Sequence, residues 1–432
     1  MKRWCLLAFG LFFFVILGVV MLLLRDVYGG PAVNADGASF IATSAQIERG
    51  EYLARVGNCA GCHTARGGEA YSGGRAVDTP FGAIYASNLT PNNETGIGAW
   101  SSGAFYRAMH EGRSRDGRLL YPAFPYPNMT LTTREDSDAI YAYLINRVKP
   151  VAQASVTHTL SVPFNNQLAL AAWRLLYFKP AQFQPDAKQS SDWNRGAYLV
   201  QGLAHCGACH STRNALGAPV AGHAYDGAMM PGGDWYAPSL TAASEASVAN
   251  WPPAEITAWL KDGATSKASA LGPMAEVIYQ STQYVSNADL LAMATYLKAL
   301  PSVEPSRASS TPSKIITQRK TNGAGAQLYA KHCANCHDEN GKGKADAFPA
   351  LAGNRAVAMA NATNVISIII KGGFAPATAG NPRPHGMPPY YHLLSDSDIA
   401  AVATHIRSSW GNAGSAVSEL DMVKYRNRLR GP

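Results

Sequence analysis

The sequence predicts an all-α protein in which three similar units follow an N-terminal membrane helix. Three observations support this prediction: a Cys-x-x-Cys-His pentad occurs three times, similar helical patterns surround each pentad, and a long apolar run opens the chain. The pentads read CAGCH at 59–63, CGACH at 206–210 and CANCH at 333–337. A chain of 432 residues also suits three domains of roughly 150 residues each.

The apolar run is the first element. Lys2 and Arg3 precede the uncharged residues 4–24. At about 1.5 Å per helical residue the run spans about 31 Å, enough for the hydrocarbon core of a bilayer. The alternative is a cleaved signal, which has a shorter apolar region of about 7–15 residues and a small-residue cleavage site. Because residues 29–34 make a poor cleavage site, we expect residues 1–30 to be a retained anchor and the rest to be exported.

Each pentad has the spacing of a haem attachment site. Two thiols three residues apart can add to both vinyl groups of one haem, and the histidine that follows reaches the iron. The pentads therefore predict three covalently bound haem c groups. The predicted attachment residues are Cys59, Cys62, Cys206, Cys209, Cys333 and Cys336, and the predicted proximal iron ligands are His63, His210 and His337. One alternative is a zinc site, which would need a second pair of ligands at the spacing found in zinc fingers. Another is a thiol redox pair, which would not need the histidine that follows the second cysteine.

The segments around the pentads also repeat. A helical pattern that opens at a glycine precedes each pentad, and a helix-length segment that closes at a glycine follows it. Each unit then ends in an amphipathic helix that begins at an aspartate. The opening glycines are Gly50, Gly196 and Gly325, the second segments are 100–112, 251–263 and a shorter 364–372, and the final helices are 136–144, 289–297 and 398–406.

These repeats set the expected domain boundaries. The segment 151–191 contains an apolar stretch at 173–178, which indicates a packed connector. By contrast, 301–323 is rich in Ser, Pro and basic residues and is typical of a mobile linker. The predicted organisation is an anchor at 1–30, units at 46–150, 192–300 and 324–411 with these connections between them, and a polar tail at 412–432.

Composition narrows the classes of function. The formal net charge of +8 suits an anionic lipid surface or an acidic partner, but it is spread along the chain and predicts no binding of nucleic acid. Haem attachment would use six of the seven cysteines and leave Cys5, so we expect no intrachain disulfide. Paired acids, a serine nucleophile, a phosphate loop and a dinucleotide fingerprint are absent at a convincing spacing, so we expect no catalytic site of its own.

The sixth position of each iron separates an electron carrier from a catalyst, because a methionine thioether there leaves no place for peroxide or oxygen. Met387 lies 50 residues after His337 in the sequence HGMPP, and Met274 lies 64 residues after His210 in LGPM. Both precede the final helix of their unit, and we predict that both are iron ligands.

In the first unit the predicted sixth ligand is Met129, 66 residues after His63. It lies only seven residues before Asp136, a shorter approach than in the other two units. The rival thioether is Met109, whose place in the helical segment indicates packing. His110 offers a bis-histidine alternative for this haem.

Longer motifs accompany the pentads. They are GGR at 73–75 with TPFG at 79–82, NLTP at 88–91 leading to TGIGAW at 95–100, LYPAFPY at 120–126, WNRGAYLV at 193–200 and GPMAEV at 272–277. With these motifs the chain resembles, over about residues 46–411, the triheme cytochrome c subunits of bacterial membrane-bound dehydrogenases. That family serves quinoprotein alcohol, flavin-dependent gluconate and related aldehyde dehydrogenases.

The resemblance implies three class I cytochrome c domains on the periplasmic side of the bacterial inner membrane. It also implies electron transfer from a catalytic dehydrogenase subunit, which oxidises an alcohol, a sugar acid or an aldehyde, to ubiquinone or another respiratory acceptor. Many relatives have PAMPY where this chain has PAFPY at 122–126, which displaces the first methionine ligand to Met129. Two other functions stay open: a multihaem peroxidase, which needs an open iron, and a cytochrome subunit of a respiratory oxidase, which co-purification would distinguish.

Overall fold

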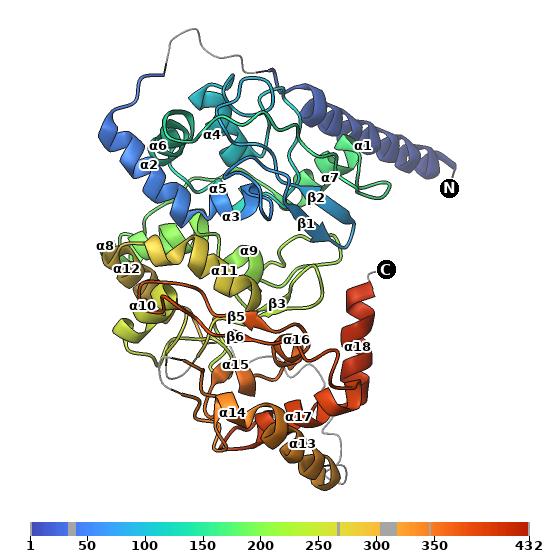
Figure 1. Ribbon diagram of the computed structural model, residues 1–432. Coiled ribbons are helices and arrows are strands. Elements are labelled where there is room, and N and C mark those ends of the chain that lie inside the picture. The colour runs from blue at the N-terminus through green and yellow to red at the C-terminus, as the bar shows by residue number, and fades with distance from the viewer. Residues whose placement is uncertain (1, 33–39, 266–267, 303–317, 345–346, 431–432) are drawn as a thin grey trace. The chain divides into compact units, whose positions relative to one another are not determined.

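The structure is a computed structural model that describes residues 2–32, 40–265, 268–302, 318–344 and 347–430 (Figure 1). It divides into two compact units, Met1–Ala54 with Cys62–Gln184, and Arg55–Gly61 with Pro185–Pro432. Helices dominate both units, as predicted. Within the described residues there are also three two-stranded antiparallel hairpins, which the all-α prediction did not include.

The N-terminal part of the chain, residues 1–184, contains the N-terminal helix, the first pentad and most of the connector, and all of it except Arg55–Gly61 belongs to the first unit. Its elements are α1 (Lys2–Tyr28), α2 (Ser44–Val56), α3 (Cys59–His63), β1 (Ala76–Thr79), β2 (Gly82–Tyr85), α4 (Ser102–Glu111), α5 (Tyr126–Met129), α6 (Arg134–Asn146) and α7 (Gln167–Tyr177). The hairpin β1–β2 turns between Thr79 and Gly82, which pair with each other. The TPFG motif accounts for this turn. Proline is favoured in turns, and Gly82 has φ +122°, a backbone conformation that residues with a side chain rarely adopt.

Helix α4 shows why the segment 100–112 was predictable. The Ser101 side chain accepts a hydrogen bond from the Ala104 backbone and caps the first turn, and Gly112 ends the helix in the left-handed conformation. Serine is favoured at the N-terminal cap of a helix because its side chain accepts such a bond, and glycine is favoured at the C-terminal cap because it adopts the left-handed conformation easily. The equivalent helices of the other pentads likewise end at glycines, Gly263 and Gly372, so all three helix predictions are confirmed.

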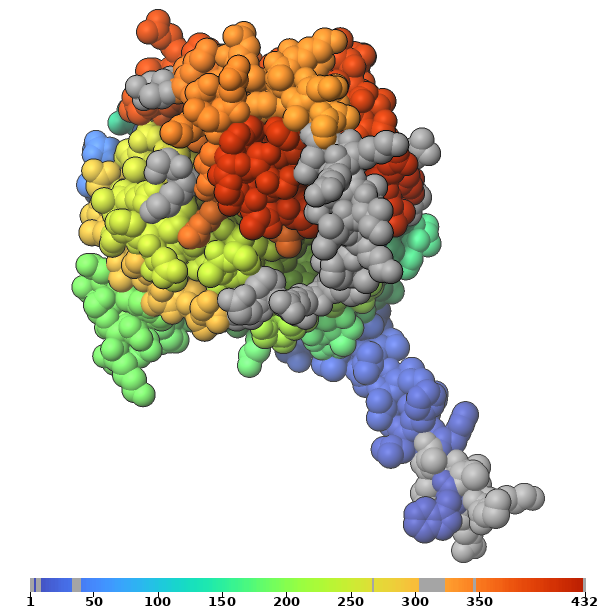
Figure 2. All heavy atoms as spheres, turned by 90° about the horizontal axis from the view of Figure 1, so that it is seen from below, coloured from blue at the N-terminus to red at the C-terminus, as the bar shows by residue number. Residues whose placement is uncertain are grey.

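Helix α1 is long and apolar enough, over Phe9–Tyr28, to cross a membrane, and none of that segment is buried inside the protein. Figure 2 shows the helix, in blue, with its apolar surface uncovered. Near its C-terminal end, Leu23 and Val27 pack against a small core of Leu119, Leu170 and Ala171. The connector helix α7 supplies two of these residues, and Figure 1 shows it beside α1.

The second unit contains the other two pentads. The strand pair precedes the glycine-closed helix around the second pentad and follows it around the third. Around the second pentad lie α8 (Ser191–Tyr198), the π-helix η1 (Leu199–Leu203), α9 (Gly207–His210), β3 (Ala228–Met229), β4 (Tyr236–Ala237), α10 (Pro253–Asp262), α11 (Gly272–Gln280), the 3₁₀ helix η2 (Thr282–Tyr284) and α12 (Asn287–Lys298). Around the third lie α13 (Gln318–His332), α14 (Ala334–His337), α15 (Arg355–Ala358), α16 (Thr363–Lys371), β5 (Gly373–Phe374), β6 (Gly386–Met387), α17 (Asp396–Ser408) and α18 (Glu419–Arg430).

The opening glycine of each repeat marks a close crossing of two helices. A Cβ atom added to Gly50, Gly196 or Gly325 would lie 1.8, 2.0 or 2.3 Å from the carbonyl oxygen of Ala139, Ala292 or Ala401, respectively. Those alanines belong to the final helices α6, α12 and α17. The first and last helices of each repeat therefore touch backbone to backbone, which only glycine permits.

An ion pair supports this crossing in two of the three repeats. Arg49 Nε lies 2.9 Å from Asp136 Oδ1, and Arg195 donates to both carboxylate oxygens of Asp289 at 2.8 Å. Each arginine immediately precedes the opening glycine. The third repeat has Ala324 there, and its aspartate instead forms a capping box with Ser395 at the start of α17.

The segment expected to be a polar tail, 412–432, joins the core around the third pentad. Val417, Met422 and Tyr425 are buried with the residues of α16 and α17. The buried Arg407 of α17 links this segment to α15. It donates to the carbonyl oxygen of Ser415, in the segment, at 2.9 Å, and to that of Val357, in α15, at 2.8 Å. The packed core thus extends past residue 411. Most of the predicted linker 301–323 lies outside the described residues.

Candidate haem sites

Each pentad lies on or beside a short helix: α3, α9 and α14. On a helix, residues i, i+3 and i+4 share one face, so the two thiols and the histidine of each pentad point to the same side. The six cysteines are free thiols, and none of them is fully buried. This arrangement places two thiols and one imidazole on one side of each pentad.

The three histidine rings are held in the same way. His63 Nδ1 lies 2.7 Å from the carbonyl oxygen of Ser87, and His210 Nδ1 lies 2.7 Å from that of Pro238. His337 Nδ1 lies 3.0 Å from the carbonyl oxygen of Pro349. Because a carbonyl only accepts, Nδ1 must carry the hydrogen, and in a neutral ring Nε2 then keeps a lone pair for a metal.

The electrostatics favour this neutral state. Burial lowers the pKa of His63, His210 and His337 below the usual value, although each backbone hydrogen bond raises it in part. Burial and the neighbouring thiol raise the pKa of Cys206 to about 12 and that of Cys333 to about 11. A site that disfavours thiolates and imidazolium suits neutral thioether links and a neutral imidazole ligand.

Sequence reasoning missed the residues that hold these rings. They lie 24, 28 and 12 positions after their histidines, so no local motif connects the two. A signal was nevertheless present, because each acceptor carbonyl lies two residues before a leucine. These leucines are Leu89, Leu240 and Leu351, the first two followed by threonine and the third by alanine.

The structure brings the predicted methionine ligand and its pentad together most clearly in the third site. Met387, in β6, packs against the same core as Cys333. Three residues later, the Tyr390 hydroxyl donates to the carbonyl oxygen of His332 at 2.8 Å, immediately before the pentad. In the second site Met274 lies in the first turn of α11 and packs with Trp259 against Ala270, Ala275 and Ile278. Both methionines are half-buried.

Met129 differs from these two, because it lies at the end of α5 and is only 4% exposed. Its assignment stays a prediction. The rival Met109 is also buried, and its sulfur accepts a hydrogen bond from the Ser137 hydroxyl at 3.7 Å, which agrees with packing. His110 stacks on Tyr106, and its Nδ1 lies 2.9 Å from the carbonyl oxygen of Thr130.

The donor set at the pentads fits haem c rather than an ion bound by side chains alone. Two thiols and an oriented imidazole match the attachment and the proximal ligation that haem c requires. A zinc site would need four ligands in a tetrahedron. Across the described ranges, no group of three or more His, Cys, Asp and Glu side chains is placed to hold a metal ion.

Comparison with known proteins identifies relatives of this chain. The cytochrome c family model matches residues 47–147 and 323–410. The cytochrome c subunit of the quinone alcohol dehydrogenase of Gluconacetobacter polyoxogenes is 39% identical over 401 residues, which cover 89% of this chain and 85% of that protein. The cytochrome c subunit of gluconate 2-dehydrogenase from Pantoea cypripedii is 35% identical over 398 residues, covering 89% and 90%. The fructose dehydrogenase cytochrome subunit of Gluconobacter japonicus is 37% identical over 404 residues, covering 88% and 82%.

Proposed function

Because this chain belongs to the family of cytochrome c subunits of bacterial membrane-bound dehydrogenases, we propose that it is the electron-transfer subunit of such a complex and carries three covalent haem c groups. Its electrons come from a catalytic dehydrogenase subunit that oxidises an alcohol, a sugar, a sugar acid or an aldehyde. It passes them to ubiquinone or another respiratory acceptor.

One observation carries this proposal: the histidines of all three pentads are oriented by the same contact. In each, Nδ1 faces a backbone carbonyl at 2.7 to 3.0 Å, so Nε2 is available for iron. That the contact occurs three times supports three haems rather than one or two.

The roles of the residues follow from their chemistry. The two cysteines of each pentad form the thioether bonds, and the histidine is the proximal ligand. Met129, Met274 and Met387 are the proposed sixth ligands, whose soft thioethers favour the reduced iron and close it to peroxide and oxygen. Haem bound in this way accepts and releases one electron. The chain's own residues therefore attach, orient and shield the group, and no residue acts on a substrate.

The proposed location is the bacterial inner membrane, with the haem units on the periplasmic side. The apolar helix α1 supports the membrane contact, and Lys2 and Arg3 at its start favour a cytoplasmic N-terminus. If the anchor is retained, the mature chain begins near Met1 and stays with membranes after a salt wash. An N-terminus found after Gly30 would show that the segment is a removed signal.

Capture of the full-length chain from solubilised membranes of its own bacterium tests the proposed partner. We expect a catalytic dehydrogenase to co-purify in fixed ratio, because the relatives of this chain are subunits of such enzymes. The isolated chain should show low-spin ferric haem and no peroxide turnover. Capture of oxidase subunits instead, or high-spin iron with peroxide turnover, would replace the proposal by one of its two rivals.

A pair of methionine variants tests the electron-carrier chemistry. Met274→Leu removes a proposed ligand and should lower the reduction potential of one haem, because a thioether raises it. Met293→Leu is the matched control, since Met293 is a buried core residue of α12. Equal potentials in the Met274 variant and the unaltered protein would contradict the ligand assignment.

A further inference from the structure

The connector helix α7 carries apolar side chains on its buried inner face and on its exposed outer face. Its inner face, with Leu170 and Ala171, is buried in the small core against which Leu23 and Val27 of α1 pack. Its outer face carries three exposed leucines. Their exposed fractions are 40% for Leu168, 52% for Leu175 and 69% for Leu176. A surface helix in water normally turns a polar face outward, so this outer face is suited to an apolar neighbour.

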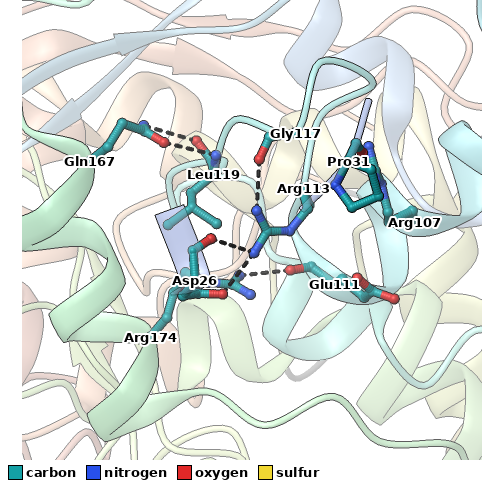
Figure 3. Close-up of polar contacts among 9 residues, drawn as sticks. All are labelled: Asp26, Pro31, Arg107, Glu111, Arg113, Gly117, Leu119, Gln167 and Arg174. Atoms are coloured by element: carbon teal, nitrogen blue, oxygen red, sulfur yellow. Dashed lines mark hydrogen bonds and ion pairs between the residues drawn. The ribbon is translucent and has the colours of Figure 1, made fainter. Parts of the chain in front are cut away.

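The two strongly polar side chains of α7 point into the protein (Figure 3). Gln167 accepts a hydrogen bond from the Leu119 backbone at 2.8 Å and donates one to the same residue's carbonyl oxygen at 3.2 Å. Arg174 donates to the carbonyl oxygen of Glu111 at 2.6 Å and to Asp26 Oδ2 at 3.0 Å. Both strongly polar side chains of α7 therefore lie on its inner face, and its outer face is left apolar.

Asp26 fastens this helix to the end of α1. Besides Arg174, its carboxylate accepts from Arg113 Nη2 at 2.7 Å, and the side chains of both arginines are only 8% exposed. Removing one member of such a pair would leave a buried charge unpaired at a high cost in free energy. The ion pairs therefore fix the position of α7 relative to α1 (Figure 3).

This position sets the depth of α7 in a membrane that α1 crosses. Leu23 belongs to the apolar run, and Val27 lies one turn beyond it. A helix that packs on these two residues lies where the run leaves the hydrocarbon. The aromatic pair Trp173 and Tyr177, with ring centres 5.6 Å apart, is of the kind enriched at that boundary. The exposed Lys179 lies two residues after Tyr177 and suits anionic headgroups.

We propose that α7 is a second membrane contact, with Leu168, Leu175 and Leu176 inserted at the boundary between headgroups and acyl chains. The proposal rests on the retained anchor of the proposed function. A lipid surface explains the outer face better than a protein partner does, because α7 packs against the apolar helix α1 and its outer face has no polar group for a directed contact. Its consequence is that the first unit is held against the bilayer in one orientation.

Quenching of fluorescent labels by spin-labelled lipid tests the proposal in the haem-loaded, full-length chain. A Cys5→Ser background leaves no other reactive thiol, since haem blocks the pentad cysteines. Single labels are then placed at Leu176→Cys in α7, at Leu17→Cys in α1, and at Leu291→Cys, an exposed leucine of α12. The proteins are reconstituted in nanodiscs of phosphatidylcholine and phosphatidylglycerol whose acyl chains carry the nitroxide near the headgroup.

We expect strong quenching at positions 17 and 176 and none at 291. Quenching at 17 without quenching at 176 would overturn the second contact and leave the anchor intact; the outer face of α7 would then be a protein-docking surface. Absence of quenching at both 17 and 176 would overturn the anchor itself. Equal quenching at 176 and 291 would show unspecific adsorption and would also contradict the proposal.

Discussion

Gly196→Ala should loosen the crossing of α8 and α12 near the second pentad. The added methyl group would lie 2.0 Å from the carbonyl oxygen of Ala292 and 2.9 Å from the Cβ atom of Tyr296. Neither neighbour can rotate away, because one is backbone and the other is the first side-chain atom. The two helices would therefore have to separate. Their separation would disturb the packing that positions the pentad.

The magnitude follows from two opposing effects. Alanine in a helix is about 1 kcal/mol more favourable than glycine. Overpacking commonly costs about 1–3 kcal/mol, and we expect about 3 kcal/mol here because backbone atoms must move. The net local destabilisation is then about 2 kcal/mol, which corresponds to a roughly 30-fold loss of hydrogen-exchange protection.

Hydrogen exchange measured by mass spectrometry on peptides from α8 and α12 is the assay, because it reports local stability in a protein with several units. The matched control is Gly103→Ala in α4, where the nearest atom to the new methyl group is the Ser101 hydroxyl oxygen at 3.7 Å. That change should raise local protection, by about 0.5–1 kcal/mol in free energy. Unchanged protection in Gly196→Ala, or equal losses in both variants, would refute the close-crossing argument.

Three further predictions concern individual side chains. Met129→Leu should remove about a third of the methionine–iron charge-transfer absorbance and Met109→Leu none; the reverse result would reassign the ligand. Hydrogen bonds from Ser395 hold the pKa of Asp398 below its usual value, so they stabilise α17 above about pH 4 and less as the pH falls further. In Ser395→Ala the pKa of Asp398, followed by NMR, should rise; an unchanged value would contradict this. Arg195→Ala should lower the free energy of unfolding by about 1–2 kcal/mol, because a partly buried carboxylate loses two hydrogen bonds of 2.8 Å; denaturant unfolding that is unaltered would show the ion pair to be unimportant.

Local patterns predicted the parts of the structure that local chemistry determines. The helices at 100–112, 251–263 and 364–372 could be predicted because each has a glycine at its C-terminal end. In the structure each of these glycines has the positive φ that glycine adopts easily. The final helices were evident from an aspartate in the first turn and a periodic apolar face. The pentads were evident because haem attachment requires a fixed spacing along one helix face.

Contacts between distant residues could not be predicted in the same way. The carbonyl that holds His210 lies 28 residues away, and Asp26 lies 148 residues from Arg174. The last helix, α18, looked polar because Met422 and Tyr425 form a narrow stripe among charges, although both are buried. Its role depends on a neighbouring core that the segment itself does not encode.

Met129 shows a limit of reasoning by repeats. Spacing placed it near the final helix like the other two methionines, but it is covered by protein, whereas Met274 and Met387 are half-buried. Phe124 stands where the resemblance implies a methionine. The side chain that completes the first site therefore depends on tertiary packing rather than on the repeat.

The number of haems bound per chain tests the central claim most directly. Intact mass spectrometry of the full-length protein, combined with a pyridine haemochrome assay, measures covalent haem and protein in the same sample. We predict three c-type haems per chain, and two in a Cys206→Ala, Cys209→Ala variant. Any other number in the unaltered protein, or haem that is released by denaturation, would contradict the assignment of the three pentads.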